Sequence, residues 1–123
     1  MGRLGRALLL VMLLAVGMAS TRATAEEEPT GSPAPDGAPT VTVLLRDNRF
    51  QPARVTVAVG TIVLWSNAED DPTVEHNVIS RDYRWASSNF VAGETYEHTF
   101  MTPGNYRYFC DLHGGMTGMV VAE

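Results

Sequence analysis

Hydrophobic and polar residues alternate in short runs from Thr40 onward. Val41, Val43 and Leu45 are separated by single residues, and the same period of two recurs over residues 55–59. Further short apolar runs, separated by glycine and proline turn signals, cover residues 61–65, 95–100, 105–110 and 119–121. Successive side chains of a strand point to opposite faces, so this period predicts half-buried strands. No window shows the helical period, which favours an all-β sandwich of seven or eight strands.

The stretch from Arg81 to Gly93 breaks the alternation, and we expect a short helix or an edge segment there. It contains Trp85, to which the pattern assigns no role, whereas Trp65 falls at a core position of its strand. His98 lies in the middle of a predicted strand, where a structural or surface position is expected.

The N-terminal region has a different composition. Arg3 and Arg6 precede an apolar run, and Ala23-Thr24-Ala25 matches a signal-peptidase site. The run is shorter than the roughly 20 apolar residues of a membrane span. We therefore expect residues 1–25 to be a cleaved signal peptide, with an uncleaved tether as the alternative. The protein is then periplasmic or otherwise exported, with no membrane insertion after cleavage.

Residues 26–39 are rich in Glu, Pro, Gly, Ser and Ala, which is typical of a flexible linker. The folded domain is expected to cover residues 40–123. Cleavage leaves 98 residues with six arginines and fourteen acidic residues, a formal charge of −8. This charge argues against nucleic acid and anionic membranes and favours a basic or neutral protein partner. Glu69-Asp70-Asp71 is interpreted as a solvated loop, with a hard cation or a basic partner as alternatives.

The single cysteine, Cys110, cannot form an internal disulfide. It is an inert buried thiol, a reactive thiol or a metal ligand, and coordination would protect it from oxidation. His113 and Met116 follow within seven residues, and His76 supplies a second imidazole. Each of these residues alone is weak evidence for a metal site, since a lone histidine is often a loop residue and methionine often fills cores. Together they match the ligand set of a mononuclear blue-copper site. Met119 competes with Met116 as the axial ligand, but lies where the last strand should run.

A resemblance to a known family rests on the Cys110-x-x-His113-x-x-Met116 loop and on four further segments. These are Phe50-Gln-Pro52, residues 59–67, His76-Asn77-Val78 and residues 106–110. They resemble the plastocyanin/azurin family of cupredoxins, and the short loop looks most like that of the amicyanins. The resemblance covers residues 40–123 and implies an eight-strand Greek-key β-sandwich. It also implies one Cu(I)/Cu(II) ion per chain, held by His76, Cys110, His113 and Met116.

The same resemblance implies roles for residues beside the ligands. The backbone N–H of Asn77 is expected to donate to the Cys110 sulfur, and its side chain to tie the ligand loops together. Leu112 stands where the family often has proline, and leucine restores a backbone N–H. We expect this N–H to give the thiolate a second hydrogen bond and to raise the reduction potential.

The expected function is that of a monomeric type 1 copper protein carrying single electrons between a donor and an acceptor. Both partners are expected to dock transiently near His113. Copper storage or delivery is the alternative, although it would favour exposed, exchangeable ligands. No enzymatic activity is expected, because a catalytic metal keeps an open position that four protein ligands would fill. Cys110 and His113 as a nucleophile–base pair would lack a third orienting group. Zinc can occupy the same ligands in a purified sample.

Overall fold

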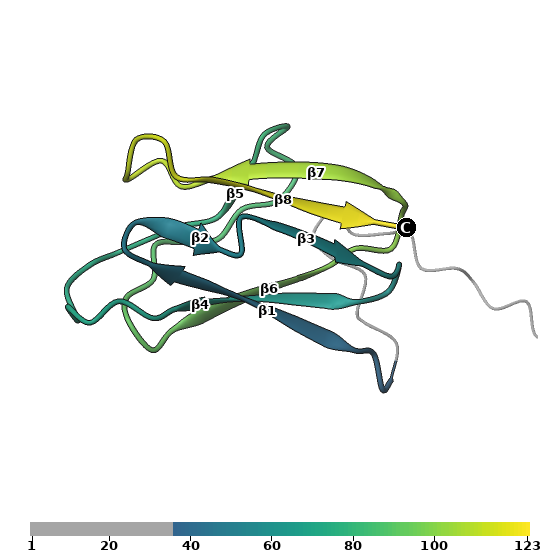
Figure 1. Cartoon of the computed structure of the whole chain (residues 1–123), viewed down its shortest axis with the longest axis horizontal. Coiled ribbons are helices and arrows are strands. Elements are labelled where there is room, and N and C mark those ends of the chain that lie inside the picture. The colour runs from purple at the N-terminus through teal and green to yellow at the C-terminus, as the bar shows by residue number, and fades with distance from the viewer. Residues whose placement is uncertain (1–35) are drawn as a thin grey trace, which may run out of the picture.

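The computed structural model describes residues 36–123, which form two packed β-sheets (Figure 1). The signal peptide predicted for residues 1–25 lies outside the described residues, as do residues 26–35 of the linker predicted for residues 26–39. The first strand begins at Thr40, where the alternation of polar and apolar residues begins.

Within residues 36–123, eight strands form two mixed sheets. One sheet has the order β2–β1–β4–β6, with bounds Arg49–Gln51, Thr40–Arg46, Ile62–Asn67 and Thr95–Thr99. The other has the order β3–β8–β7–β5, with bounds Arg54–Val57, Thr117–Ala122, Gly104–Phe109 and Ile79–Ser80. β1 pairs in parallel with β4, and β3 in parallel with β8, while the other pairs are antiparallel. The predicted all-β sandwich is confirmed.

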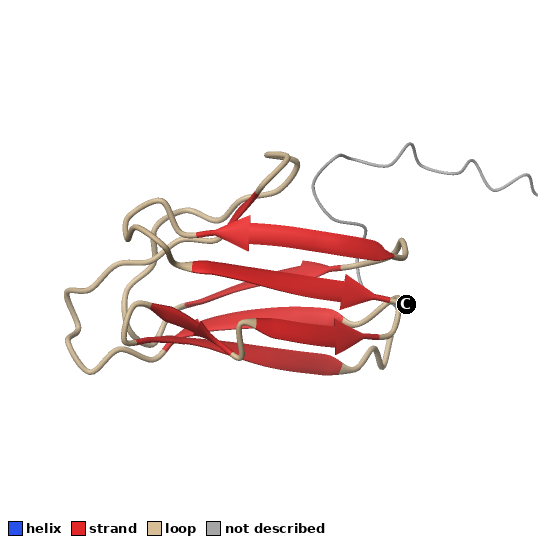
Figure 2. Ribbon diagram, turned by 45° about the horizontal axis from the view of Figure 1, so that its top comes forward, coloured by secondary structure: helices blue, strands red, loops and turns tan. Residues whose placement is uncertain are grey.

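Residues 36–123 contain no helix (Figure 2), and therefore no helix long and apolar enough to span a membrane. The short helix considered for residues 81–93 is therefore wrong. That stretch is irregular and attaches to its neighbours by isolated bridges, one pairing His76 with Phe90 and one pairing Ile79 with Ala86.

β2 is a strand that the periodicity did not predict. It follows β1 through a two-residue turn in which Asp47 and Asn48 have φ angles of 53° and 54°. Two consecutive left-handed residues define a type I′ turn, which suits the twist of a hairpin and favours Asn, Asp and Gly. The turn signal was present in the sequence, but the three residues of β2 are too few to show a period.

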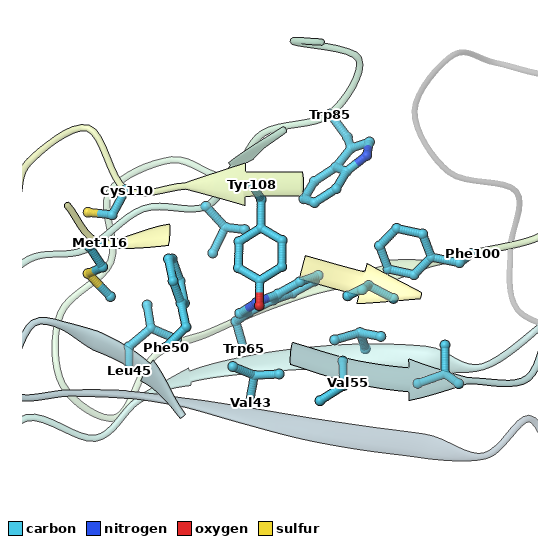
Figure 3. Packing of buried hydrophobic residues seen from close by; sticks show 14 of the residues in the cluster. Val43, Leu45, Phe50, Val55, Trp65, Trp85, Phe100, Tyr108, Cys110 and Met116 are labelled. Carbon is cyan, nitrogen blue, oxygen red and sulfur yellow. The ribbon is translucent and has the colours of Figure 1, made fainter. Parts of the chain in front are cut away.

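The core lies between the two sheets and is rich in aromatic side chains (Figure 3). Trp65 and Tyr108 are both fully buried and meet edge to face, with ring centroids 5.2 Å apart. On β1, Val43 and Leu45 are fully buried, as the alternation predicted. Val59 departs from the expected pattern, with 37% of its surface exposed, because β3 ends two residues earlier.

Trp85, to which the sequence assigned no role, belongs to this core. Its ring stacks on His98 with centroids 4.8 Å apart and an interplanar angle of 18°. Burial lowers the pKa of His98 below its usual 6.5, since a charged imidazole is poorly solvated there. His98 is thus a structural residue, as expected, and is neutral at pH 7.

The lowered pKa of His98 predicts a pH dependence of stability. In the unfolded chain the imidazole binds a proton near pH 6.5, whereas the folded protein resists protonation. The free energy of unfolding should therefore decline as the pH falls through 6.5, until the folded pKa is passed. Urea denaturation from pH 7.5 to 5 should show this decline more steeply in the native protein than in His98→Gln. An NMR titration midpoint for His98 above 6.5 would contradict the prediction.

Candidate metal centre

Two loops at one end of the sandwich carry the predicted copper ligands (Figure 1). Cys110 directly follows β7, and the chain returns to β8 through His113 and Met116. His76 lies in the long connection between β4 and β5, which reaches the same end. Residues 34 positions apart in the sequence are therefore brought together by the fold.

The loop between β7 and β8 is closed by its own backbone. The Cys110 N–H donates to the Met116 carbonyl at 3.0 Å, and the Met116 N–H donates to the His113 carbonyl at 3.3 Å. Gly115 has a φ of 80°, a left-handed conformation that glycine adopts without steric cost. The loop thus folds His113 back toward the sulfur that β7 positions.

The donor atoms of three predicted ligands converge. Cys110 Sγ lies 3.9 Å from Nδ1 of His76 and 3.7 Å from Nδ1 of His113. One ligand atom from each of the three residues falls within 4.8 Å of the others. His76 and Cys110 are buried, with 0% and 3% of their surfaces exposed, whereas His113 is half-buried. Among these three, His113 is therefore the residue that connects the cluster to the surface.

His76 is held firmly on its far side. Its backbone exchanges two hydrogen bonds with Phe90, at 3.1 and 2.9 Å. Its Nε2 lies 2.8 Å from Oε1 of Glu69, which leaves Nδ1 facing Cys110. A carboxylate on the outer nitrogen fixes the orientation of a ligating imidazole and raises its basicity.

The interpretation of residues 69–71 as a solvated loop is wrong for Glu69, which turns inward toward His76. Only 11% of its side chain is exposed, whereas Asp70 pairs with Arg46 on the surface at 2.8 Å. Burial by itself raises the pKa of Glu69, but hydrogen bonds from the Asn48 N–H and from His76 outweigh it and lower that pKa. No feature of the sequence indicates which of the three acidic residues turns inward.

Asn67 is a second residue whose role the sequence did not reveal. Its side-chain amide donates to the carbonyls of Val74 and Phe90 at 3.0 and 2.9 Å, and its oxygen accepts from the Glu69 N–H at 3.1 Å. All three bonds lie in the segments that position His76. Asn67 therefore joins the end of β4 to the loop that delivers this histidine.

Replacing Asn67 with leucine should destabilise the protein and loosen the His76 loop. The carbonyls of Val74 and Phe90 would lose their donor, and an unsatisfied buried polar group costs about 1–3 kcal/mol. Urea denaturation of the metal-free protein measures the loss. Asn105→Leu, at an exposed position of β7, is the control and should change the stability little. Equal losses in the two variants would count against this role of Asn67.

Asn77 ties the two ligand loops together, as the family resemblance implied. Its Oδ1 accepts from the Asp111 N–H at 3.0 Å, and its amide donates to Asp111 and to Asn89. The expected hydrogen bonds to the thiol are not found, however. Within residues 36–123, the hydrogen-bonding contacts of Cys110 Sγ are with the two imidazoles alone. Neither the Asn77 N–H nor the Leu112 N–H donates to it, so the expected effect of Leu112 on the potential loses its structural basis.

The two candidate axial methionines lie on different sides of the sheet. Met116 is buried, and its sulfur lies at the same end of the core as that of Cys110 (Figure 3). Met119 is in β8, where it pairs with Arg54 and with Arg107. Since its neighbour Val120 is fully buried, Met119 faces outward, away from the core. The fold therefore favours Met116.

Comparison with known proteins identifies the family. A family model described as a cupredoxin-like domain matches residues 7–122. The chain belongs to the cupredoxin family. This cupredoxin is 36% identical to a chloroplastic plastocyanin of Tetradesmus obliquus over 60% of the chain, spanning 58% of that plastocyanin. It is 30% identical to amicyanin-alpha of Methylorubrum extorquens, with 80% of this chain and 77% of the relative covered.

Solved structures agree with this assignment. A purple cupredoxin from Nitrosopumilus maritimus superimposes with a TM-score of 0.60 at 26% identity, covering 67% of this cupredoxin and 98% of the other chain. A copper-containing nitrite reductase from Thermus scotoductus gives a TM-score of 0.64 at 28% identity. The match covers 76% of this cupredoxin but 24% of the reductase, so the likeness is to one part of a larger enzyme.

The donor set of this cupredoxin fits one copper ion. A thiolate suits Cu(I), and imidazole suits both oxidation states. The two imidazoles present a ring nitrogen toward the sulfur, and the thioether of Met116 borders the same end of the core. No second cluster of three His, Cys, Asp or Glu ligand atoms occurs in residues 36–123.

Proposed function

We propose that this chain is a type 1 blue copper protein that carries single electrons between redox partners outside the cytoplasmic membrane. The residues that would hold the copper are His76, Cys110 and His113, with Met116 as a weaker fourth donor. Residues 1–25 act in this proposal as a cleaved signal peptide and residues 26–39 as a linker to the copper domain. The family assignment supports copper and electron transfer, and the geometry of the three donors supports the ligand set.

The separation of the donor atoms is the observation that carries the proposal. With a metal–nitrogen bond of about 2.05 Å and a metal–sulfur bond of about 2.3 Å, donors about 120° apart are separated by about 3.8 Å. A tetrahedral angle would bring them to about 3.6 Å. The two observed distances from Cys110 Sγ, 3.7 and 3.9 Å, bracket the trigonal value and leave room for one ion between the donors. A trigonal His₂Cys site with a long axial methionine is typical of electron-transfer copper.

The surrounding residues favour transfer of electrons over chemistry on a substrate. Copper, when bound, supplies a one-electron couple. The buried His76 and Cys110 are fixed by Glu69, Phe90 and the end of β7, so these donors cannot rearrange easily. Burial also excludes water from the cluster, and four protein donors leave no open position for a substrate. For these reasons we propose no catalytic role.

The surface around His113 suits a transient partner. Leu112 is 43% exposed, and Gly114 and Gly115 are exposed beside the half-buried imidazole. A small apolar patch with little bulk lets a partner approach the ring closely. Redox complexes are brief, and their interfaces fall at the small end of the range. We therefore place the docking of donor and acceptor at this end of a monomer.

The first test is the spectrum of the copper-loaded protein. One equivalent of Cu(II) should give an intense thiolate-to-copper absorption band in the visible range and a narrow copper hyperfine splitting in EPR. A reductant should bleach the band reversibly. Rapid removal of the copper by a chelator would instead favour storage or delivery. A colourless product would show that Cys110 does not bind copper in this geometry.

Met116 and Met119 provide a matched pair for the axial ligand. Met116→Leu should shift the EPR parameters and raise the reduction potential, because loss of the thioether leaves Cu(II) less stabilised than Cu(I). Met119→Leu makes the same chemical change on the outer face of the sheet and should leave both unchanged. Cyclic voltammetry and EPR of the two variants make the comparison. A shift in Met119→Leu alone would show that Met119, and not Met116, is the axial ligand.

A further inference from the structure

The outer face of the β3–β8–β7–β5 sheet carries a groove where three arginines meet. The groove has a volume of about 670 Å³, and Arg54, Arg81 and Arg107 line it together with Met119 and Thr117. None of the four proposed copper ligands borders it. A neighbouring hollow of about 200 Å³ shares Arg81 and Arg107. This region is therefore distinct from the metal centre.

Strand register explains why two of these arginines stand side by side. β8 lies between β3 and β7, and Met119 pairs with Arg54 on one side and with Arg107 on the other. Directly paired residues project to the same face of a sheet, which here is the outer one. Neighbouring strands are about 4.8 Å apart, so the backbones of the two arginines are separated by about 10 Å across the thioether.

The third arginine extends the row to the sheet edge. The Arg81 N–H donates to the Arg107 carbonyl at 2.9 Å, and the guanidinium carbon lies 5.1 Å from the centroid of Phe109. Phe109 also meets Tyr83 edge to face, with centroids 6.2 Å apart. Tyr83 is 75% exposed and has a φ of 58°, an unusual conformation for a bulky residue. A large aromatic side chain is thus presented to solvent beside the arginines.

The charges in the groove have no partners among the described residues. Arg46 and Arg84 each form an ion pair with an aspartate, but no carboxylate of residues 36–123 lies within 4.0 Å of the guanidinium nitrogens of Arg54, Arg81 or Arg107. Residues 36–123 contain eleven acidic residues and six arginines, with no lysine. Half of the positive charge therefore lines one groove of an otherwise acidic domain. Gathering like charges is unfavourable unless an anionic group neutralises them.

We propose that this groove is a docking site for an acidic protein partner. Carboxylates of the partner pair with Arg54, Arg81 and Arg107, where guanidinium and carboxylate can form two parallel hydrogen bonds. The spacing across the sheet suits several carboxylates spread along a chain better than one compact ion. Arginine, tyrosine and methionine are enriched at protein interfaces. A polynucleotide carries a phosphate at every residue and would extend its charge over the acidic surface around the groove, whereas a protein partner can confine its carboxylates to the groove.

Binding of an acidic peptide to the reduced, copper(I)-loaded protein tests the proposal. The probe is hexaglutamate, followed by NMR shifts of backbone amides and of the arginine Nε–H groups. Shifts should centre on β3, β7 and β8. In R54Q/R107Q the affinity should fall at least roughly tenfold, because paired charges are lost. R46Q/R49Q removes the same charge from the β1–β2 hairpin and should change the affinity less than about twofold.

Several results would overturn this assignment. If the affinity for hexaglutamate fell equally in the two double variants, the peptide would be responding to the net charge of the protein and not to this groove. If inorganic phosphate or citrate bound the same residues as tightly as the peptide, the groove would be a small-anion site. An absence of shifts would also contradict the proposal. The copper absorption band should persist in both double variants, so failure here is distinguishable from failure of the proposed electron-transfer function. If circular dichroism showed R54Q/R107Q to be unfolded, the single variants R107Q and R46Q would replace the two double variants in the same comparison.

Discussion

Cys110→Ser should abolish the intense visible absorption of the copper-loaded protein while leaving the β-sandwich folded. Cys110 contributes the sulfur that lies 3.9 and 3.7 Å from the two imidazole nitrogens, and the band arises from electron transfer out of that sulfur. A serine oxygen is harder and binds Cu(I) weakly, so the variant should also hold reduced copper poorly. Absorption and EPR spectra after addition of one equivalent of Cu(II) measure the first effect, and circular dichroism measures the fold.

Two further samples make this test decisive. Thr117→Ser changes an exposed residue just after the same loop and should retain the band at full intensity. Substitution of Co(II) in the native protein should give a thiolate charge-transfer band in the near ultraviolet, also lost in Cys110→Ser. A serine variant that kept its blue colour would rule out the cysteine as a copper ligand.

Trp65→Ala should cause the largest loss of stability. The indole is fully buried and packs against Trp85, Tyr96, Phe100 and Tyr108. Truncating such a side chain costs about 3–5 kcal/mol through lost burial and the cavity left behind. A domain of this size is typically stable by roughly 4–13 kcal/mol. The midpoint of thermal unfolding should therefore fall by at least about 12 °C.

Tyr83→Ala is the matched comparison for this prediction. It also removes an aromatic side chain, but one that is 75% exposed, so the free energy of unfolding should change by less than about 0.5 kcal/mol. Urea and thermal denaturation of the metal-free proteins report both changes without interference from copper binding. Similar losses in the two variants would show that burial does not set the contribution of Trp65.

The strands were predictable where alternation ran long enough to distinguish the two faces. Val43 and Leu45 are buried and Leu44 is 41% exposed, as the period of two requires. β2 and β5 contain three and two residues, and no period can be detected over so short a length. Trp85 was unassigned because its burial depends on a core built by both sheets, which local pattern does not describe.

The same distinction between local pattern and folded contacts applies to the candidate site. Cys110, His113 and Met116 fall in one short motif, so local sequence was enough to group them. The inward position of Glu69 cannot be predicted from sequence, because its contact with His76 arises only when the loop after β4 closes. Nothing in three consecutive acidic residues indicates which one turns inward. The expectation of hydrogen bonds to the Cys110 sulfur rested on family resemblance. Whether such bonds form depends on small displacements of the backbone, which the sequence does not record.

The position of β8 has a consequence for how the protein matures. β8 is the last strand along the chain, yet it occupies the interior of its sheet, and β3 has no other neighbour there. β5 can pair with β7 alone, but β3 cannot join that sheet until residues 117–122 have folded as β8. Pairing of strands so distant in sequence is also slow. The Cys110 loop joins β7 to β8, so we expect it to take its final form, and to bind metal, only after β8 has paired with both of its neighbours.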